Sequence, residues 1–214
     1  MIKACIFDLD GVIVDTAHYH FIAWKRLAKE LGLDLTEKEN ERLKGVSRMR
    51  SLEIILELGG VDLPLAEKEK LAEKKNAWFV ELVNAIQPEE IFTGVKKLIQ
   101  DLKKLGIQVA LASSSRNAGT VIRLLKIADQ FDAMVDGGMV THSKPDPEIF
   151  LLAAKKLGVE PVDCVVFEDA EAGVEAALRA GMKCVGVGSA EQLGKANIVV
   201  SKTADFDITK LNRL

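Results

Sequence analysis

Two aspartates placed two residues apart, Asp8 and Asp10, are the residues of this chain best suited to chemistry. They follow an apolar run at residues 2–7 that is typical of a buried strand, and alternate residues of a strand point to the same side. Two carboxylates this close repel each other, so one must hold a proton or a cation must lie between them. Gly11 then lets the backbone leave the strand in a conformation that other residues resist. This pattern is typical of a phosphoryl-transfer site with magnesium and an aspartate nucleophile, although the four residues alone could also form a simple turn.

Two further polar clusters follow apolar runs later in the chain. Residues 107–112 lead into Ser113, Ser114, Ser115, Arg116 and Asn117. Hydroxyls and backbone N–H groups at such a junction suit phosphate oxygens, although a serine cluster is more often only a helix cap or a loop. Residues 164–167 lead into Glu168 and Asp169, which could instead cap a helix. Together with the first pair, they would complete an oxygen-rich site that suits Mg²⁺.

A lysine between these clusters, Lys144, is flanked by Pro145 and Pro147. Pro147 suits the first turn of a helix, and Pro145 favours an extended residue before it, so the prolines would fix the direction of the lysine. Such a lysine can neutralise a transferring phosphoryl group and the attacking carboxylate. Without the prolines, a solvated loop lysine would be the default interpretation.

The elements that must position these side chains alternate between strands and helices. Apolar strands at 107–112, 131–135, 163–167 and 184–187 alternate with helical patterns at 94–105, 118–126, 147–157 and 172–180. This predicts a parallel sheet covered on both faces, with ligands bound beyond the carboxyl ends of its strands. Residues 17–83 are helical in pattern, with a capping box from Thr36 and Glu39. We expect about four helices in this insert, placed over the crevice.

The composition is that of a soluble globular protein. The 214 residues are 48% hydrophobic and 29% charged, with a net charge of −3, which gives no electrostatic case for nucleic acid or membrane binding. Cys5, Cys164 and Cys184 lie in apolar runs without paired spacing, as expected of reduced core thiols. No targeting segment or membrane-length apolar run is present. We therefore expect a cytoplasmic protein and a monomer.

The four polar segments, in this order, resemble the motifs of the haloacid dehalogenase (HAD) superfamily of phosphatases and phosphomutases. The agreement is most specific at residues 8–11, 144–147 and 168–169. The resemblance implies an α/β fold, a HAD-like Rossmannoid parallel sheet core with an inserted helical cap domain. We assign residues 1–15 and 88–214 to the core domain and residues 16–87 to the cap. The resemblance also implies that Mg²⁺ is the cofactor.

Segments of the cap narrow the resemblance to the β-phosphoglucomutase family. Residues 15–24, 43–48 and 75–76 carry it, together with 112–115 and 186–188 of the core. It implies interconversion of β-glucose 1-phosphate and glucose 6-phosphate through β-glucose 1,6-bisphosphate, and sugar phosphates as ligands.

The resemblance also implies roles for the core residues. Asp8 would be the nucleophile and Asp10 the general acid and base. The metal would be held by Asp8, Asp169 and the backbone carbonyl of Asp10, with Glu168 supporting it. The phosphate contacts implied in the core are Ser113, Lys144, Ser115, Arg116 and Asn117. Arg116 stands where the family has lysine, and its planar fork differs from an ammonium group.

The cap residues would recognise substrate and signal closure. Thr16 lies at the hinge and can contact Asp10 when the cap is open. His20 and Lys75 would couple cap closure to the placement of Asp10. Arg48 would hold the non-transferring phosphate, and the sugar pocket would be lined by Lys44, Gly45, Val46 and Ser51. Taken singly, His20 could be a structural histidine, and Lys44 and Arg48 a solvated helix face.

Two other functions fit parts of this pattern. A sugar-phosphate or phosphoglycolate phosphatase would share the fold and the nucleophile, with water accepting the phosphoryl group. A non-catalytic sugar-phosphate-binding protein would need no nucleophile, so the acidic pairs and Lys144 argue against it.

Overall fold

The central feature of the computed structural model is a parallel sheet. The model describes residues 1–214, the side chains of residues 212 and 213 excepted. The strand order is β3-β2-β1-β4-β5-β6, and the strands are β1 (Ala4–Phe7), β2 (Gln108–Ser113), β3 (Ala133–Asp136), β4 (Cys164–Glu168), β5 (Lys183–Val187) and β6 (Ile198–Val200). Phe7 pairs with Leu111 on one side and Phe167 on the other. The residues that follow β1, β2 and β4 therefore emerge at one edge of the sheet, as predicted.

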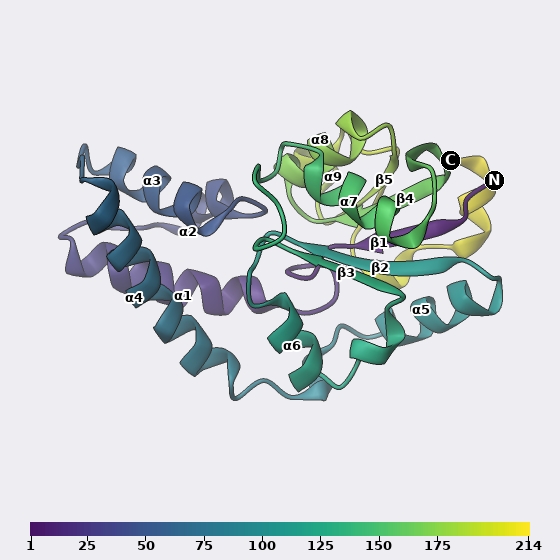
Figure 1. Cartoon of the computed structure of the whole chain (residues 1–214), viewed down its shortest axis with the longest axis horizontal. Helices are drawn as coiled ribbons and strands as arrows, with labels where there is room; N and C mark the ends of the chain where they lie inside the picture. Colours follow the sequence, from purple (N-terminus) through teal and green to yellow (C-terminus); the bar gives the residue numbers. More distant parts are fainter.

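Helices cover both faces of the sheet because alternate strand residues point to opposite faces. Phe7 and Leu111 pack in one cluster with α5 (Val95–Lys104) and α6 (Ala118–Leu124). Ile6 and Ala110 pack in the other with α7 (Glu148–Leu157) and α8 (Glu171–Arg179). Figure 1 shows the two layers on either side of the strands. The predicted α/β fold class is confirmed.

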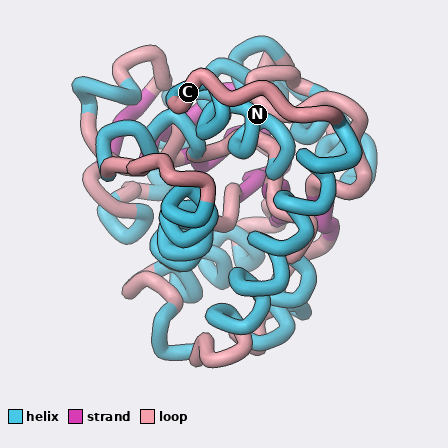
Figure 2. The backbone as a smooth tube through the Cα atoms, turned by 90° about the vertical axis from the view of Figure 1, so that its left-hand side faces the viewer, coloured by secondary structure: helices cyan, strands magenta, loops and turns pink.

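The cap segment forms a separate group of helices at one end of the molecule (Figure 1). It contains α1 (Thr16–Glu30), α2 (Glu37–Asn40), α3 (Arg48–Leu58) and α4 (Leu65–Val83), and Thr36 and Glu39 form the predicted capping box. Trp24, Leu27 and Leu52 belong to an apolar cluster built from this segment. Figure 2 looks from this end, with the strands behind the helices. The division into two domains at residues 16 and 87 stays a prediction.

The C-terminal part of the core contains elements that we did not predict. Helix α9 (Ala190–Leu193) and the edge strand β6 follow β5. Short 3₁₀ helices lie in both the cap and the core, at residues 41–43, 88–90, 128–130, 161–163, 203–205 and 208–213, and the last is the short final helix that Leu211 and Leu214 indicate. The peptide bond between Lys144 and Pro145 is cis, which the sequence did not indicate. Among the described residues, no helix combines the length and hydropathy needed to cross a membrane.

Candidate active site

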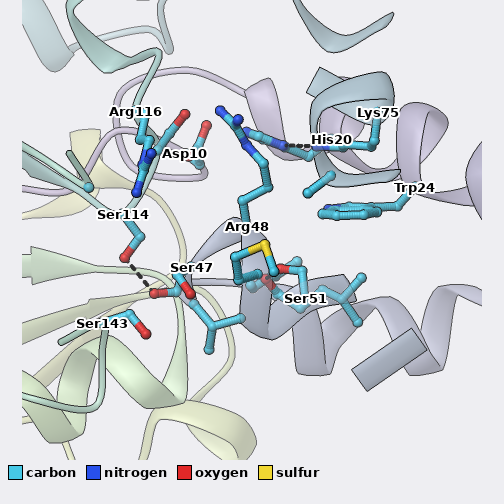
Figure 3. A pocket seen from close by; sticks show the side chains of 18 of the residues that line it. Asp10, His20, Trp24, Ser47, Arg48, Ser51, Lys75, Ser114, Arg116 and Ser143 are labelled. Carbon is cyan, nitrogen blue, oxygen red and sulfur yellow. Dashed lines mark hydrogen bonds between the residues drawn. The ribbon is translucent and has the colours of Figure 1, made fainter. Parts of the chain in front are cut away.

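A cavity of about 800 Å³ lies where the cap meets the carboxyl ends of the strands. Twelve of the predicted site residues line it: Asp8, Asp10, His20, Lys44, Gly45, Val46, Arg48, Ser51, Lys75, Ser115, Arg116 and Asp169. The other five, Thr16, Ser113, Asn117, Lys144 and Glu168, lie outside this lining. Figure 3 shows residues of the cap and the core directed into the same space.

The most buried part of the site is an ion-pair cluster below the cavity. The Nζ atom of Lys144 lies 2.5 Å from Oδ1 of Asp8 and also donates to Oε1 of Glu168. The side chains of Lys144 and Glu168 are fully buried. Burial alone would lower the pKa of Lys144, but the two carboxylates outweigh it and raise this pKa. Lys144 is therefore a permanent cation beside the carboxylate that we expect to be the nucleophile.

Asp10 lies on the cavity wall in a hydrogen bond from the hydroxyl of Thr16. This is the contact that the resemblance implies for an open cap, so Asp10 is not turned towards the sugar site although cap and core touch. Burial, followed by repulsion from Asp8, raises the pKa of Asp10 to about 8. A carboxyl group with this pKa exists in both protonation states near neutral pH. That property suits a group that gives and takes protons.

A fourth carboxylate, Asp169, lies against the Gly11 backbone near Asp8. A Cβ atom added at Gly11 would lie 2.1 Å from Oδ2 of Asp169, so only glycine lets the chain pass this close. Burial raises the pKa of Asp169 well above its usual range, with further contributions from Glu168 and Asp8. An all-oxygen donor set with this unmet negative charge fits a hard divalent cation. The carboxylates predicted to hold Mg²⁺ are near enough to perturb one another's pKa, and their chemistry suits the ion.

His20 and Lys75 form a pair inside the cap. Their Nδ1 and Nζ atoms are 2.6 Å apart, and the His20 ring stacks on Phe79 with ring centroids 3.8 Å apart. Burial, Lys75 and Arg48 lower the pKa of His20 well below its usual value. A neutral His20 that accepts from Lys75 at Nδ1 carries its proton on Nε2. The ring can therefore act as a donor towards the cavity.

The loop after β2 gathers hydroxyl and cationic groups at the cavity. The Oγ atom of Ser113 accepts from the backbone N–H of Ser115, and Ser115 Oγ accepts from the N–H of Asn117. Arg116 lies on the cavity wall opposite Arg48 of the cap, and burial followed by the charge of Arg116 lowers the pKa of Arg48. Glu73 also lines the cavity and offsets part of the charge of Arg48. Two guanidinium groups that face each other favour an anion between them.

Several site contacts were missed by the sequence reasoning. Ser114 was noted only as part of the serine cluster, yet its hydroxyl donates to the Gly45 carbonyl of the cap. The Asn76 side chain of the cap accepts from Asn117. Gly173 packs against Glu168, since an added Cβ would lie 1.9 Å from Oε1. These pairs are far apart in the sequence, and no local pattern joins them.

His142, Asp146 and Glu148 lie at the surface with their possible ligand atoms within 4.8 Å of one another, a spacing that could hold a metal ion. The Glu148 carboxylate there accepts from the backbone N–H groups of Thr141 and His142. Asp146 Oδ1 accepts from the N–H of Glu148. The group therefore holds the loop that carries Lys144.

Comparison with known proteins agrees with this geometry. Residues 2–181 match the model of the haloacid dehalogenase-like hydrolase family. A β-phosphoglucomutase of Bacillus subtilis is 47% identical over 98% of this chain and 94% of its own length. A phosphorylated carbohydrates phosphatase of Thermotoga maritima is 39% identical over 85% of this chain and 82% of its own. The crystal structure of a Clostridium difficile β-phosphoglucomutase superposes with a TM-score of 0.96, at 46% identity, covering 100% of this chain and 96% of that one. The chain belongs to the haloacid dehalogenase-like hydrolase family.

Proposed function

We propose that the protein is a β-phosphoglucomutase, which interconverts β-glucose 1-phosphate and glucose 6-phosphate through β-glucose 1,6-bisphosphate. The observation that carries this proposal is the presence of a phosphoryl-transfer site and an anion site at one cavity. Asp8, with Lys144 buried behind it, forms the first in the core, and Arg48 and Arg116 form the second where cap and core meet. A bisphosphate needs both sites at once, and turning round in the cavity exchanges its two phosphates.

The core residues supply the transfer step. An Asp8 carboxylate oxygen attacks the phosphorus of the bisphosphate, and the bond from phosphorus to the sugar oxygen breaks. Lys144 balances the charge on the transferring group, and Ser113 helps to hold it. Asp10 protonates the departing sugar oxygen and, in the reverse direction, removes the proton of the attacking hydroxyl. For this step, Asp10 must give up its hydrogen bond from Thr16 and form one with the sugar hydroxyl.

The cap residues make this transfer depend on substrate. Arg48, with Ser115 and Arg116, holds the phosphate that is not transferred, and Asn117 lies at the edge of the site for the transferring group. The sugar lies against Lys44, Gly45, Val46 and Ser51. His20, oriented by Lys75, links the closed cap to the alignment of Asp10. Closure around a bound sugar phosphate excludes water, which favours the sugar hydroxyl as the acceptor.

Magnesium would be held by Asp8, Asp169 and the backbone carbonyl of Asp10, with Glu168 in support. The bound cation supplies charge neutralisation for the transferring phosphoryl group. A cation held there would also offset the raised pKa of Asp169, which burial causes first and the charges of Glu168 and Asp8 increase further. We further propose that the enzyme acts as a monomer in the cytoplasm on small sugar phosphates, without nucleic acid or membrane.

The test follows glucose 6-phosphate and inorganic phosphate in one reaction from β-glucose 1-phosphate, Mg²⁺ and a trace of the bisphosphate. We expect glucose 6-phosphate as the main product, and Asp8→Asn should abolish its formation. Arg48→Ala should raise KM by one to two orders of magnitude, since a charge-assisted pair contributes about 1.5–3 kcal/mol. Inorganic phosphate as the main product would establish the phosphatase alternative, which the Thermotoga relative exemplifies.

A further inference from the structure

A direct hydrogen bond joins the phosphate-binding loop of the core to the substrate loop of the cap. The Ser114 hydroxyl donates to the carbonyl oxygen of Gly45, with Oγ and O separated by 2.7 Å (Figure 3). Ser114 is half-buried and lies on the cavity wall. Gly45 lies between Lys44 and Val46, which we place in the sugar pocket. The bond therefore connects two substrate-binding segments that belong to different parts of the molecule.

The same contact surface has two further points of attachment. Asn117 Nδ2 donates to Asn76 Oδ1 at 2.8 Å, which joins the same core loop to α4 of the cap. Gly45 also packs against the loop after β4, since an added Cβ would lie 3.0 Å from the Cβ of Ala170. Its φ of +72° is a conformation that glycine adopts readily. The cap thus contacts the core through two hydrogen bonds and one close packing contact.

Swinging the cap away from the core would break the Ser114–Gly45 bond, because it joins the two parts, so the bond favours the closed form in which cap and core touch. Resting on the proposed function, we propose that Ser114 is a positioning residue. It fastens Gly45 to the core and so raises the fraction of molecules whose cap is closed before substrate binds. The apparent affinity for a ligand of the closed form is reduced by the fraction of molecules that are open. Ser114 therefore lowers KM without touching the reacting atoms.

The size of the expected change in KM follows from the kind of hydrogen bond that is removed. Removing one neutral hydrogen bond should reduce the closed-to-open ratio by up to about tenfold, which is about 1.4 kcal/mol. KM should rise by the factor by which the closed fraction falls. Substrate phosphates bridge cap and core once bound, so kcat should stay within about twofold.

The experiment measures closure and kinetics on the same variants. Dyes on Lys38→Cys in the cap and Lys195→Cys in the core, both exposed positions, report the distance between the two parts by energy transfer. The native thiols are buried and do not compete for label. Ser114→Ala is compared with Ser114→Thr, which keeps a hydroxyl donor, and with Ser201→Ala at an exposed position outside the site.

We expect Ser114→Ala to populate the open form in the absence of substrate and to raise KM by the matching factor. Ser114→Thr should restore both properties, and Ser201→Ala should change neither. An unchanged distance distribution in Ser114→Ala overturns the proposal. So does an equal loss of kcat in the alanine and threonine variants. The distance measurement needs no substrate, so it tests the role of the Ser114–Gly45 hydrogen bond even if the assay with β-glucose 1-phosphate fails.

Discussion

Lys144 bridges Asp8 and Glu168 with a fully buried side chain. Two neighbouring prolines in the sequence predicted that this lysine is held in place, and the structure places it beside the expected nucleophile. Its second partner, Glu168, could not be predicted, because the pairing depends on where β4 lies relative to the loop before α7. The charge balance of the site is thus a property of three separate segments.

Lys144→Met should destabilise the metal-free protein by about 3–5 kcal/mol at neutral pH, because two buried carboxylates lose their counter-charge. Urea unfolding in the presence of a chelator measures this change. Added Mg²⁺ should recover part of the loss. Lys103→Met is the matched control, since its ammonium is partly exposed and its bonds to Gln130 and Asp132 lie at the surface. Equal effects of the two substitutions would contradict the prediction.

Asp10 should make stability depend on pH in a defined direction. Its pKa is raised from 3.8 to about 8, by burial first and Asp8 second. Between these two values the folded protein binds a proton that the unfolded chain has released. The free energy of unfolding therefore falls as pH rises from about 4 to about 8.

Asp10→Asn removes this dependence. We expect the variant to gain stability relative to the native protein as pH rises through the same window, and no relative gain below about pH 4. Denaturation of both proteins at pH 5 and pH 8, with a chelator present, measures the difference. Parallel pH profiles would show that Asp10 does not titrate in this range.

At the scale of elements, the glycine in the first turn of α8 shows how a helix start can hold a functional side chain. Alanine in a helix is normally favoured over glycine by about 1 kcal/mol. At Gly173, however, the added Cβ would lie 1.9 Å from the buried Glu168 carboxylate. Gly173→Ala should therefore destabilise the protein by about 1–3 kcal/mol and lower kcat through displacement of Glu168.

Gly119→Ala in α6 is the matched control for this substitution. Its added Cβ would lie 3.2 Å from the flexible end of Met134, so we expect an unchanged or slightly higher melting temperature and normal kcat. Melting curves and initial rates of both variants make the comparison. A stabilised, fully active Gly173→Ala variant would contradict the argument.

The elements themselves were largely predictable because their sequences agree with their environments. Strands β1, β2 and β4 are continuous apolar runs buried on both faces, as parallel strands require. Strand β6 has only three residues, each half-buried at the sheet edge, and gives no such signal. The contacts between Ser114 and Gly45, and between Asn117 and Asn76, depend on how far the cap swings. The periodicity of the sequence does not encode the angle between cap and core.

At the scale of the whole molecule, the C-terminal segment holds the loop that follows β1. The buried Thr203 hydroxyl donates to the carbonyl of Val12 at 2.7 Å. Thr203→Val leaves this carbonyl without its donor, and we expect a loss of about 1–3 kcal/mol in urea unfolding. Thr209→Val, at an exposed position, should change stability by less than about 0.5 kcal/mol. Equal losses would show that the bond to Val12 contributes nothing.

The position of β1 at the centre of the sheet has a consequence for biosynthesis. Ala4 pairs with Gln108 of β2 and with Cys164 of β4. In a nascent chain, β1 therefore has no neighbouring strand until β2 has been translated, and it has only one until β4 has been translated. The apolar cluster of the cap joins Trp24, Leu52 and Ala72, whose partners follow much sooner. We expect ribosome-stalled chains ending near residue 120 to resist protease in the cap while residues 2–7 remain a target for chaperones. The surroundings of Asp8 would therefore be completed late in synthesis.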